Sequence, residues 1–289
     1  MGIFVAALPE TTNIDGGCCA PSQQLAKDFS AYYTAAWRLL HDPSEVYFRG
    51  LVSDGGPSIS PQPQGYKYLP SFLLLIFPLL LLPYGSALTA FDILQFALLP
   101  LMAALLYSIL RGRGLVVTSV VTAAVLVLPL PLAYSQWTLS ASYYWQWAEG
   151  QCKVLETFLL LSALALAKSG RPRVAGAVFA LAAFDPRFAV LSAPLVLAYA
   201  KNLRAFAVCG AATFALANLA LLYPPTLSGF FGMVFTSGAL TPPYPYTFIP
   251  VVAVLLLLYV DRKEVVSAVR RVGRKDSSWA GRTLATHEP

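Results

Sequence analysis

Residues 69–83 read LPSFLLLIFPLLLLP, and this stretch contains no charged side chain. A second apolar run, VVTSVVTAAVLVLPLPL, occupies residues 116–132. A soluble domain buries such runs only among many interleaved polar residues. The 289-residue chain is 57% hydrophobic and 12% charged, about half the roughly 25% charge of a soluble globular protein, and its mean hydropathy is +0.63. The sequence therefore predicts an all-α, polytopic helical membrane protein.

Apolar segments recur along most of the chain, and at about 20 residues per crossing they predict roughly seven or eight transmembrane or partly inserted helices. The expected segments are residues 69–84, 86–110, 114–134, 152–167, 174–184, 188–200, 203–223 and 246–260. Several are shorter than a full crossing, and Pro70, Pro78 and Pro83 interrupt the first one. We therefore expect some broken or partly inserted helices.

The sequence divides into a polar segment (1–67), a multi-span domain (68–260) and a basic tail (261–289). Within the first segment, residues 28–48 are typical of an aromatic amphipathic helix that lies in the membrane interface. Its expected apolar face comprises Phe29, Tyr32, Tyr33, Ala36 and Leu40, with Trp37 at the edge. Pro43 is expected to end this helix.

Basic residues fall in every second loop, which is the pattern of cytoplasmic loops. They are Arg111 and Arg113, then Lys168, Arg171 and Arg173, then Lys201 and Arg204, then the tail from Arg262 to Arg282. The tail is accordingly expected in the cytoplasm and residues 135–151, 184–188 and 223–246 outside, in a multi-pass protein of the cell membrane. If residues 69–84 cross the bilayer fully, segment 1–67 is cytoplasmic. If they only dip into it, the segment lies outside, which is the placement we favour.

The net charge of +6 and the pI of about 9.1 follow from these loops, and no aromatic-interleaved basic patch indicates nucleic-acid binding. The four cysteines show neither metal-ligand nor disulfide spacing, so we expect no metal site and no cofactor. The first residues, MGIFVAALPE, lack the basic and long apolar regions of a cleavable signal peptide.

Charged side chains at membrane level are costly and often functional, which marks Asp28, Glu149, Asp185 and Arg187. Each also has a structural interpretation. Asp28 can cap a helix, Asp185 and Arg187 can form a local ion pair, and Glu149 can be solvated in its loop. The residues alone leave these alternatives open.

Several short motifs in a fixed order resemble glycosyltransferase family 87. They are Asp28-Phe29-x-x-Tyr32-Tyr33-x-Ala35-Ala36-Trp37-x-Leu39-Leu40 with Val46-Tyr47, Tyr66-x-Tyr68-Leu69-Pro70 before Pro78 and Leu82-Pro83, Glu149-Gly150-Gln151, Lys168-x-Gly170-Arg171 before Ala175-Gly176, and Phe184-Asp185-Pro186-Arg187-Phe188. The resemblance spans roughly residues 28–200. It implies a GT-C-like fold and an inverting mannosyltransferase that uses a polyprenyl-phosphate sugar. It also implies a transmembrane helix before the acidic loop, which MGIFVAALP is too short to supply.

The resemblance further implies that an acidic residue of the first extracytoplasmic loop is the catalytic base, and this residue maps to Asp28. A carboxylate in hydrogen-bond reach can take the proton of an attacking sugar hydroxyl. The donor phosphate needs nearby cations, for which Arg187, Lys67 and Arg49 are candidates. The remaining candidates are expected to bind substrate. They are Tyr32, Tyr33, Tyr66, Tyr68, Glu149, Gln151 and Asp185.

The function expected from these observations is transfer of a hexose, mannose first, from a polyprenyl-phosphate donor to an extracytoplasmic glycan, glycolipid or glycoprotein. Two alternatives stay open. One is a non-catalytic GT-C-like subunit that works with a partner membrane protein in a glycosylation or lipid-anchor assembly. The other is a transporter or flippase, because broken helices and membrane-level charges suit that class as well.

Overall fold

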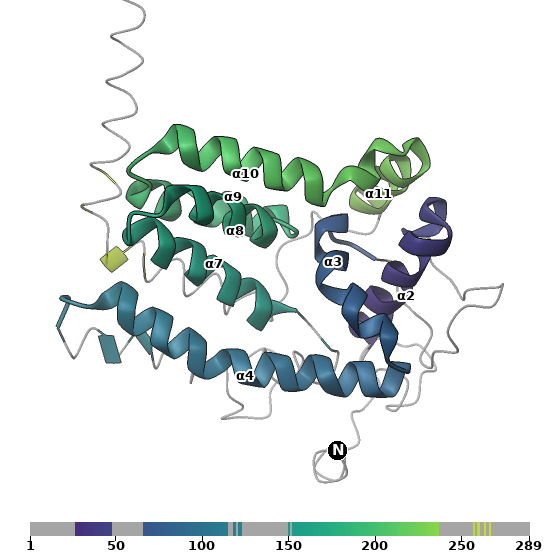
Figure 1. The fold of residues 1–289 in the computed structure, drawn as a ribbon, viewed down its shortest axis with the longest axis horizontal. Helices are drawn as coiled ribbons and strands as arrows, with labels where there is room; N and C mark the ends of the chain where they lie inside the picture. Colours follow the sequence, from purple (N-terminus) through teal and green to yellow (C-terminus); the bar gives the residue numbers. More distant parts are fainter. Residues whose placement is uncertain are drawn as a thin grey trace, which may run out of the picture.

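The computed structural model is mainly helical in the residues that it describes, which are 27–47, 66–114, 150, 152–236 and single positions within 118–122 and 257–266 (Figure 1). No strand occurs in that part of the chain, so the all-α prediction is confirmed there. The apolar segments predicted at 114–134 and 246–260, and the tail 261–289, lie almost entirely outside the described residues.

Helix α4 (Tyr84–Leu110) is the longest described element, with 27 residues, and its most apolar 18-residue stretch has a mean hydropathy of 2.1. At 1.5 Å per residue it is about 40 Å long, which exceeds the roughly 30 Å hydrocarbon core of a bilayer. Among the described helices, α4 alone has the length and composition of a membrane span. Phe91, Leu98 and Met102 lie on its buried face, whereas Ile93 is exposed on the other. The span predicted at 86–110 therefore exists as one apolar helix.

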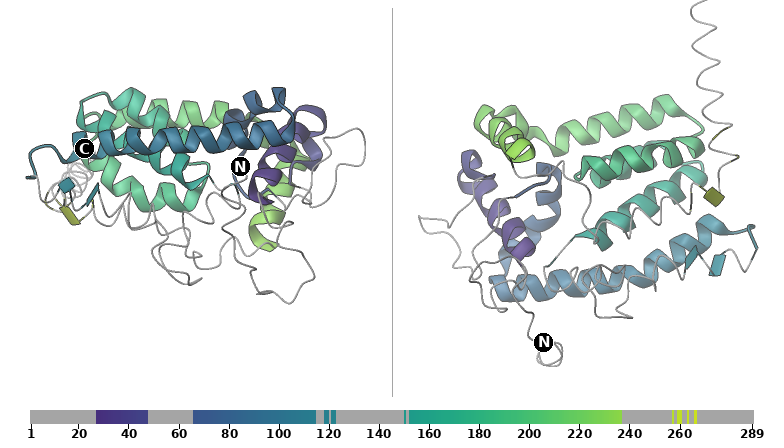
Figure 2. Two further views of the ribbon diagram at one scale, coloured as in Figure 1. Left: turned by 90° about the horizontal axis from the view of Figure 1, so that it is seen from below. Right: turned by 180° about the vertical axis from the view of Figure 1, so that it is seen from behind.

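Four shorter helices complete the bundle (Figures 1 and 2). Helix α7 (Lys153–Lys168) packs beside α4, and on the far side of α7 lie α8 (Pro172–Ala182), α9 (Pro186–Tyr199) and α10 (Leu203–Ala217). They fall in the apolar segments predicted from residue 152 to 223, and α7, α8 and α9 are shorter than a full crossing, as predicted. The 203–223 segment, predicted long enough to cross, is divided into α10 and a 3₁₀ turn, η5 (Leu219–Leu222). Helices α8 and α10 make close backbone contact because Gly176 faces Gly210. A Cβ atom at Gly176 would lie 2.2 Å from the Phe206 carbonyl oxygen. Small residues commonly permit such contacts between membrane helices.

The first apolar segment is broken, as its prolines predict. It consists of η3 (Pro70–Phe72), α3 (Leu73–Ile76) and η4 (Phe77–Leu81). Pro70 and Pro78 stand in the opening positions of the two 3₁₀ turns, where a missing N–H costs no helical hydrogen bond. The segment turns across one end of the α4, α7–α10 bundle instead of running beside α4 (Figures 1 and 2). The placement of this segment relative to the bilayer, and with it the side of residues 1–67, stays a prediction.

Helix α2 (Lys27–His41) ends just before Pro43, as predicted, and a 3₁₀ turn, η2 (Pro43–Glu45), follows it. Its expected apolar face is buried, except that Leu40 is 58% exposed. Ser30 and Thr34, on the opposite side of the helix, are also buried. Most of α2 is therefore enclosed by protein on more than its expected apolar face, and its place in the membrane interface stays a prediction.

Residues 223–246 were predicted as an outer loop, but part of this range forms helix α11 (Pro224–Thr236). Two consecutive prolines suit the first turn of a helix, where their missing N–H groups have no partner to lose. Thr226 Oγ1 donates a hydrogen bond to the Pro43 carbonyl oxygen at 2.7 Å, and a Cβ at Gly229 would lie 3.3 Å from Tyr47 Cβ. These contacts attach α11 to the end of α2.

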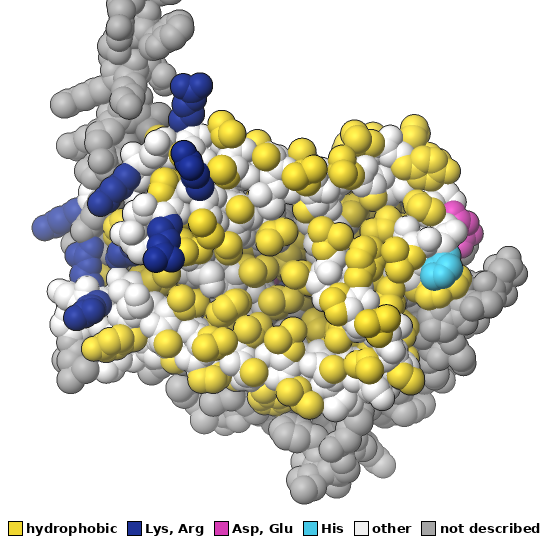
Figure 3. All heavy atoms as spheres, in the orientation of Figure 1, with side chains coloured by type: hydrophobic (Ala, Val, Ile, Leu, Met, Phe, Trp, Pro, Cys, Tyr) yellow, Lys and Arg dark blue, Asp and Glu magenta, His cyan; other side chains and the backbone are white. Residues whose placement is uncertain are grey.

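The two ends of the bundle differ in charge. Lys and Arg side chains gather at one end, where α4 ends and where the α7–α8 and α9–α10 turns lie, whereas α2, α3 and α11 lie at the other end (Figures 1 and 3). The basic side chains exposed in those turns are Arg111, Arg113, Arg171, Arg173, Lys201 and Arg204. The basic turns, which the sequence predicts on one side of the membrane, are therefore neighbours in space. They lie at the end of the bundle away from α2, the helix that carries Asp28.

Candidate functional site

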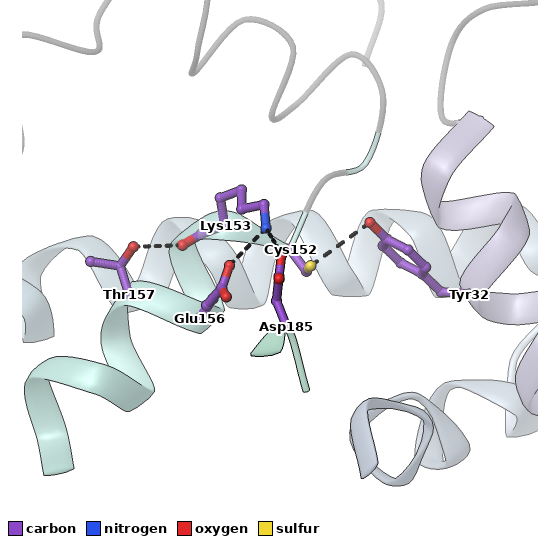
Figure 4. A network of polar contacts seen from close by, with 6 residues as sticks. All are labelled: Tyr32, Cys152, Lys153, Glu156, Thr157 and Asp185. Atoms are coloured by element: carbon purple, nitrogen blue, oxygen red, sulfur yellow. Dashed lines mark hydrogen bonds and ion pairs between the residues drawn. The ribbon is translucent and has the colours of Figure 1, made fainter. Parts of the chain in front are cut away.

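A buried lysine lies between two carboxylates at the end of the bundle that faces α2 (Figure 4). Lys153 Nζ donates to Glu156 Oε2 at 2.8 Å and to Asp185 Oδ2 at 2.9 Å. All three side chains are at most 2% exposed. We call this group the Lys153 centre (Lys153, Glu156 and Asp185). The ammonium takes the position between the carboxylates where another cation would otherwise bind, and within the described residues no three His, Cys, Asp or Glu side chains gather as a metal site would require.

Local structure explains how the Lys153 centre forms. Lys153 and Glu156 are three residues apart in α7, so they lie on neighbouring positions of one helix face. Thr157 Oγ1 donates to the Lys153 carbonyl oxygen at 2.7 Å. Asp185 comes from the turn between α8 and α9, because Pro186 begins α9 directly after it. This turn is shorter than the 184–188 loop predicted from the sequence.

An aromatic cluster lies beside the Lys153 centre, comprising Tyr32, Tyr66, Tyr68, Phe72 and Phe184, all of them buried. Ring centroids are 4.8 Å apart for Tyr32 and Phe72, and 4.7 Å apart for Phe72 and Phe184. Lys153 Nζ lies 5.3 Å from the centroid of the Tyr68 ring, within the range of a cation–π contact. The cluster therefore joins α2, the residues before α3 and the α8–α9 turn into one packed unit.

The hydroxyl groups of these tyrosines make internal contacts. Tyr32 donates to Cys152 Sγ at 3.7 Å, Tyr33 to the Leu82 carbonyl at 2.7 Å and Tyr66 to the Leu69 carbonyl at 2.7 Å. Burial raises the pKa of the Tyr68 phenol well above its ordinary value, so it stays neutral. Of the four tyrosines predicted to bind substrate, Tyr32, Tyr66 and Tyr68 are thus brought together. The Tyr33 ring lies apart from them, against Tyr84. Contact with substrate stays a prediction for all four.

Asp28 lies in the first turn of α2, where a carboxylate is favoured by the helix dipole. Burial is the main cause of the raised pKa of both Tyr32 and Tyr68, and the charge of Asp28 is a lesser one. The next residue, Phe29, packs against Gly150 so closely that a Cβ at Gly150 would lie 2.5 Å from Phe29 Cβ. The start of α2 therefore packs directly against Gly150, which lies just before Lys153 in the chain.

The other predicted residues are distributed as follows. Asp185 joins the site but pairs with Lys153, a partner that the sequence pattern did not indicate. Lys67 is exposed beside the aromatic cluster. Arg187 belongs to the first turn of α9, although its side chain lies outside the described part of the structure. Arg49, Glu149 and Gln151 also lie outside the described residues.

Three charged residues escaped the sequence reasoning because they stand inside apolar segments. Lys153 and Glu156 carry a usable signal, since opposite charges three residues apart share one helix face. Asp92 lies within α4, and its Oδ1 atom is buried with no hydrogen-bond partner among the described residues. A carboxylate is costly inside a helix long enough to span a membrane. The position of Asp92 within an apolar segment was therefore a signal for a functional residue that the sequence contained.

A comparison with protein families identifies the family of the chain. Residues 66–273, more than two thirds of the chain, match the model of glycosyltransferase family 87. The chain belongs to this family. The resemblance seen in the motifs is thereby confirmed, over a range that begins later and ends later than the motifs do.

Tyr66, Tyr68 and the Lys153 centre fall in the range matched to glycosyltransferase family 87, whereas Tyr32 precedes it. Asp28 precedes it. No curated protein and no solved structure matches the chain.

Proposed function

We propose that this glycosyltransferase transfers a hexose, mannose first, from a polyprenyl-phosphate donor to an acceptor hydroxyl outside the cytoplasm. The acceptor is a glycan, a glycolipid or a glycoprotein. The observation that carries the proposal is the packing of α2, whose first turn carries Asp28, on the aromatic cluster and the α8–α9 turn. This packing lies at the end of the bundle that lacks the basic turns. Basic turns favour the cytoplasmic side, so the proposed site faces the other side, and a multi-pass, GT-C-like arrangement with a cytoplasmic C-terminus is part of the proposal.

In the proposed reaction, Asp28 takes the proton of the acceptor hydroxyl while the oxygen bonds to the anomeric carbon of the donor. The bond between that carbon and the phosphate oxygen breaks, and the electron pair leaves with the polyprenyl phosphate. Attack opposite the leaving group inverts the configuration. The leaving phosphate is anionic and needs cations, for which Lys67, Arg187 and Arg49 are the proposed sources.

Lys153 is a poor candidate for the phosphate ligand, although it is the cation nearest to the aromatic cluster. Two carboxylates already contact its ammonium at 2.8 and 2.9 Å, so the group carries no surplus positive charge. A phosphate placed there would also meet Glu156 and Asp185. The exposed Lys67 and the α9 residue Arg187 fit the role better because neither belongs to this centre.

A labelled polyprenyl-phosphate mannose donor tests the proposal in membranes that contain the wild type, Asp28→Asn or Asp42→Asn at equal abundance. Asp42 is the matched control, because it lies at the other end of α2 and its side chain accepts a hydrogen bond from Ser44 N, which an asparagine can also do. Transfer should vanish in Asp28→Asn and persist in Asp42→Asn. Full activity of Asp28→Asn would overturn its assignment as the base.

A second candidate function is a non-catalytic subunit of a glycosylation assembly. The observation that favours it is the start of the family match at Tyr66, which leaves Asp28 outside the matched range. In that case the wild type transfers no sugar, both variants resemble it, and a catalytic family member assayed in parallel is active.

A further inference from the structure

The two carboxylates of the Lys153 centre hold the same ammonium but connect different parts of the molecule. Glu156 belongs to α7, as Lys153 does, so its ion pair lies within one helix. Asp185 belongs to the α8–α9 turn, 32 residues farther along the chain. Only the pair with Asp185 therefore ties two separate elements together.

The α8–α9 turn is held from a second side by the residues that precede α3. Leu69 N donates to the Phe184 carbonyl oxygen at 3.0 Å, and the Phe184 ring packs on Phe72 at 4.7 Å and on Tyr68 at 5.6 Å. The turn is thus clamped between Lys153 and the aromatic cluster. Because Arg187 follows Asp185 by two residues, any shift of the turn also shifts the start of α9.

We propose that the Lys153–Asp185 ion pair positions the α8–α9 turn for binding of the anionic sugar donor. Lys153 and Asp185 are then positioning residues, and Asp185 acts through the turn instead of touching the sugar. This inference rests on the proposed function, and it adds that donor binding depends on one salt bridge between α7 and the turn. The acceptor base, Asp28, lies on α2, a different element, so the chemical step should respond less than donor binding does.

Asp185→Asn and Glu156→Gln form a matched pair for testing this. Each removes one negative charge from within 2.9 Å of the same ammonium, and each residue is buried. Asp185→Asn should raise the KM for the donor about tenfold and change kcat about twofold at most, which is the signature of lost binding rather than lost chemistry. Glu156→Gln should change the donor KM less than about twofold.

A purely structural or electrostatic role for the centre would move both variants alike, since the charge change and the partner atom are the same. Equal changes in donor KM, or a fall in kcat at unchanged KM in Asp185→Asn, would therefore overturn the inference. If Asp185→Asn does not accumulate, a second matched pair, Asp185→Glu and Glu156→Asp, replaces the first. These variants keep the charge and alter the reach, and only Asp185→Glu should raise the donor KM.

Equilibrium binding of the labelled donor separates a failure of this inference from a failure of the proposed function. A wild type that neither transfers the sugar nor binds the donor overturns both. A wild type that transfers, with the two variants indistinguishable in donor KM and donor Kd, overturns the positioning role alone.

Discussion

Replacement of Gly150 by alanine should separate the fold of this protein from its activity. Gly150 has a φ of +66°, and a Cβ at this position would lie 2.5 Å from Phe29 Cβ and 3.3 Å from Phe29 N. Carbon atoms in contact prefer about 3.5–4.0 Å, and Phe29 Cβ is bonded directly to the backbone of α2. Rotation of a side chain therefore cannot relieve the overlap, and the start of α2 must move away by about 1 Å.

Asp28 precedes Phe29 and moves with it. A displacement of about 1 Å at a reacting group can lower a rate about 100-fold, so we expect a loss of that order in kcat for Gly150→Ala. The left-handed backbone adds a strain of about 1–2 kcal/mol for any residue with a Cβ, which should lower the unfolding temperature without unfolding the protein.

Gly170→Ala is the matched control, because Gly170 has a φ of +78° and no atom within 4 Å of the site of a new Cβ. It imposes the same kind of strain in the α7–α8 turn with no collision. Both variants are compared by thermal unfolding in detergent and by transfer from labelled donor. If Gly150→Ala is folded and transfers sugar as fast as Gly170→Ala, the seating of α2 on Gly150 does not position the catalytic base.

Four further predictions concern stability, each measured by thermal or denaturant unfolding of the purified protein. Lys153→Met leaves two buried carboxylates without their cation and should cost about 3–5 kcal/mol, whereas a triple variant that also neutralises both carboxylates should recover most of the loss. Gly176→Ala forces α8 away from the α10 backbone and should cost about 1–3 kcal/mol. Gly232→Ala, a helical glycine in open space, should instead stabilise α11 by about 0.5–1 kcal/mol. Asn218→Ala removes the acceptor of the buried Ser71 N–H at 3.0 Å and should cost about 1–3 kcal/mol.

The membrane class, the family and the helical segments could be predicted from the sequence because hydropathy and proline positions act locally. The prolines of residues 70–83 predicted a broken helix, and the basic turns predicted which ends of the helices lie together. The α11 helix was missed because a proline-rich, aromatic stretch is typical of a loop, and only the contacts with Pro43 and Tyr47 show how its helix is held.

The site shows the same division between local and long-range information. Asp28, Tyr68 and Asp185 could be singled out as residue types in suggestive places, since charged and aromatic side chains at membrane level are informative one at a time. Their arrangement was decided only by tertiary structure. Lys153 meets Asp185 across 32 residues of chain, and the pairing depends on how α7 packs beside the α8–α9 turn. No periodicity or spacing in the sequence predicts that contact. It forms when the helices bury their apolar faces against one another, because a buried ammonium is stable only with carboxylates that balance its charge.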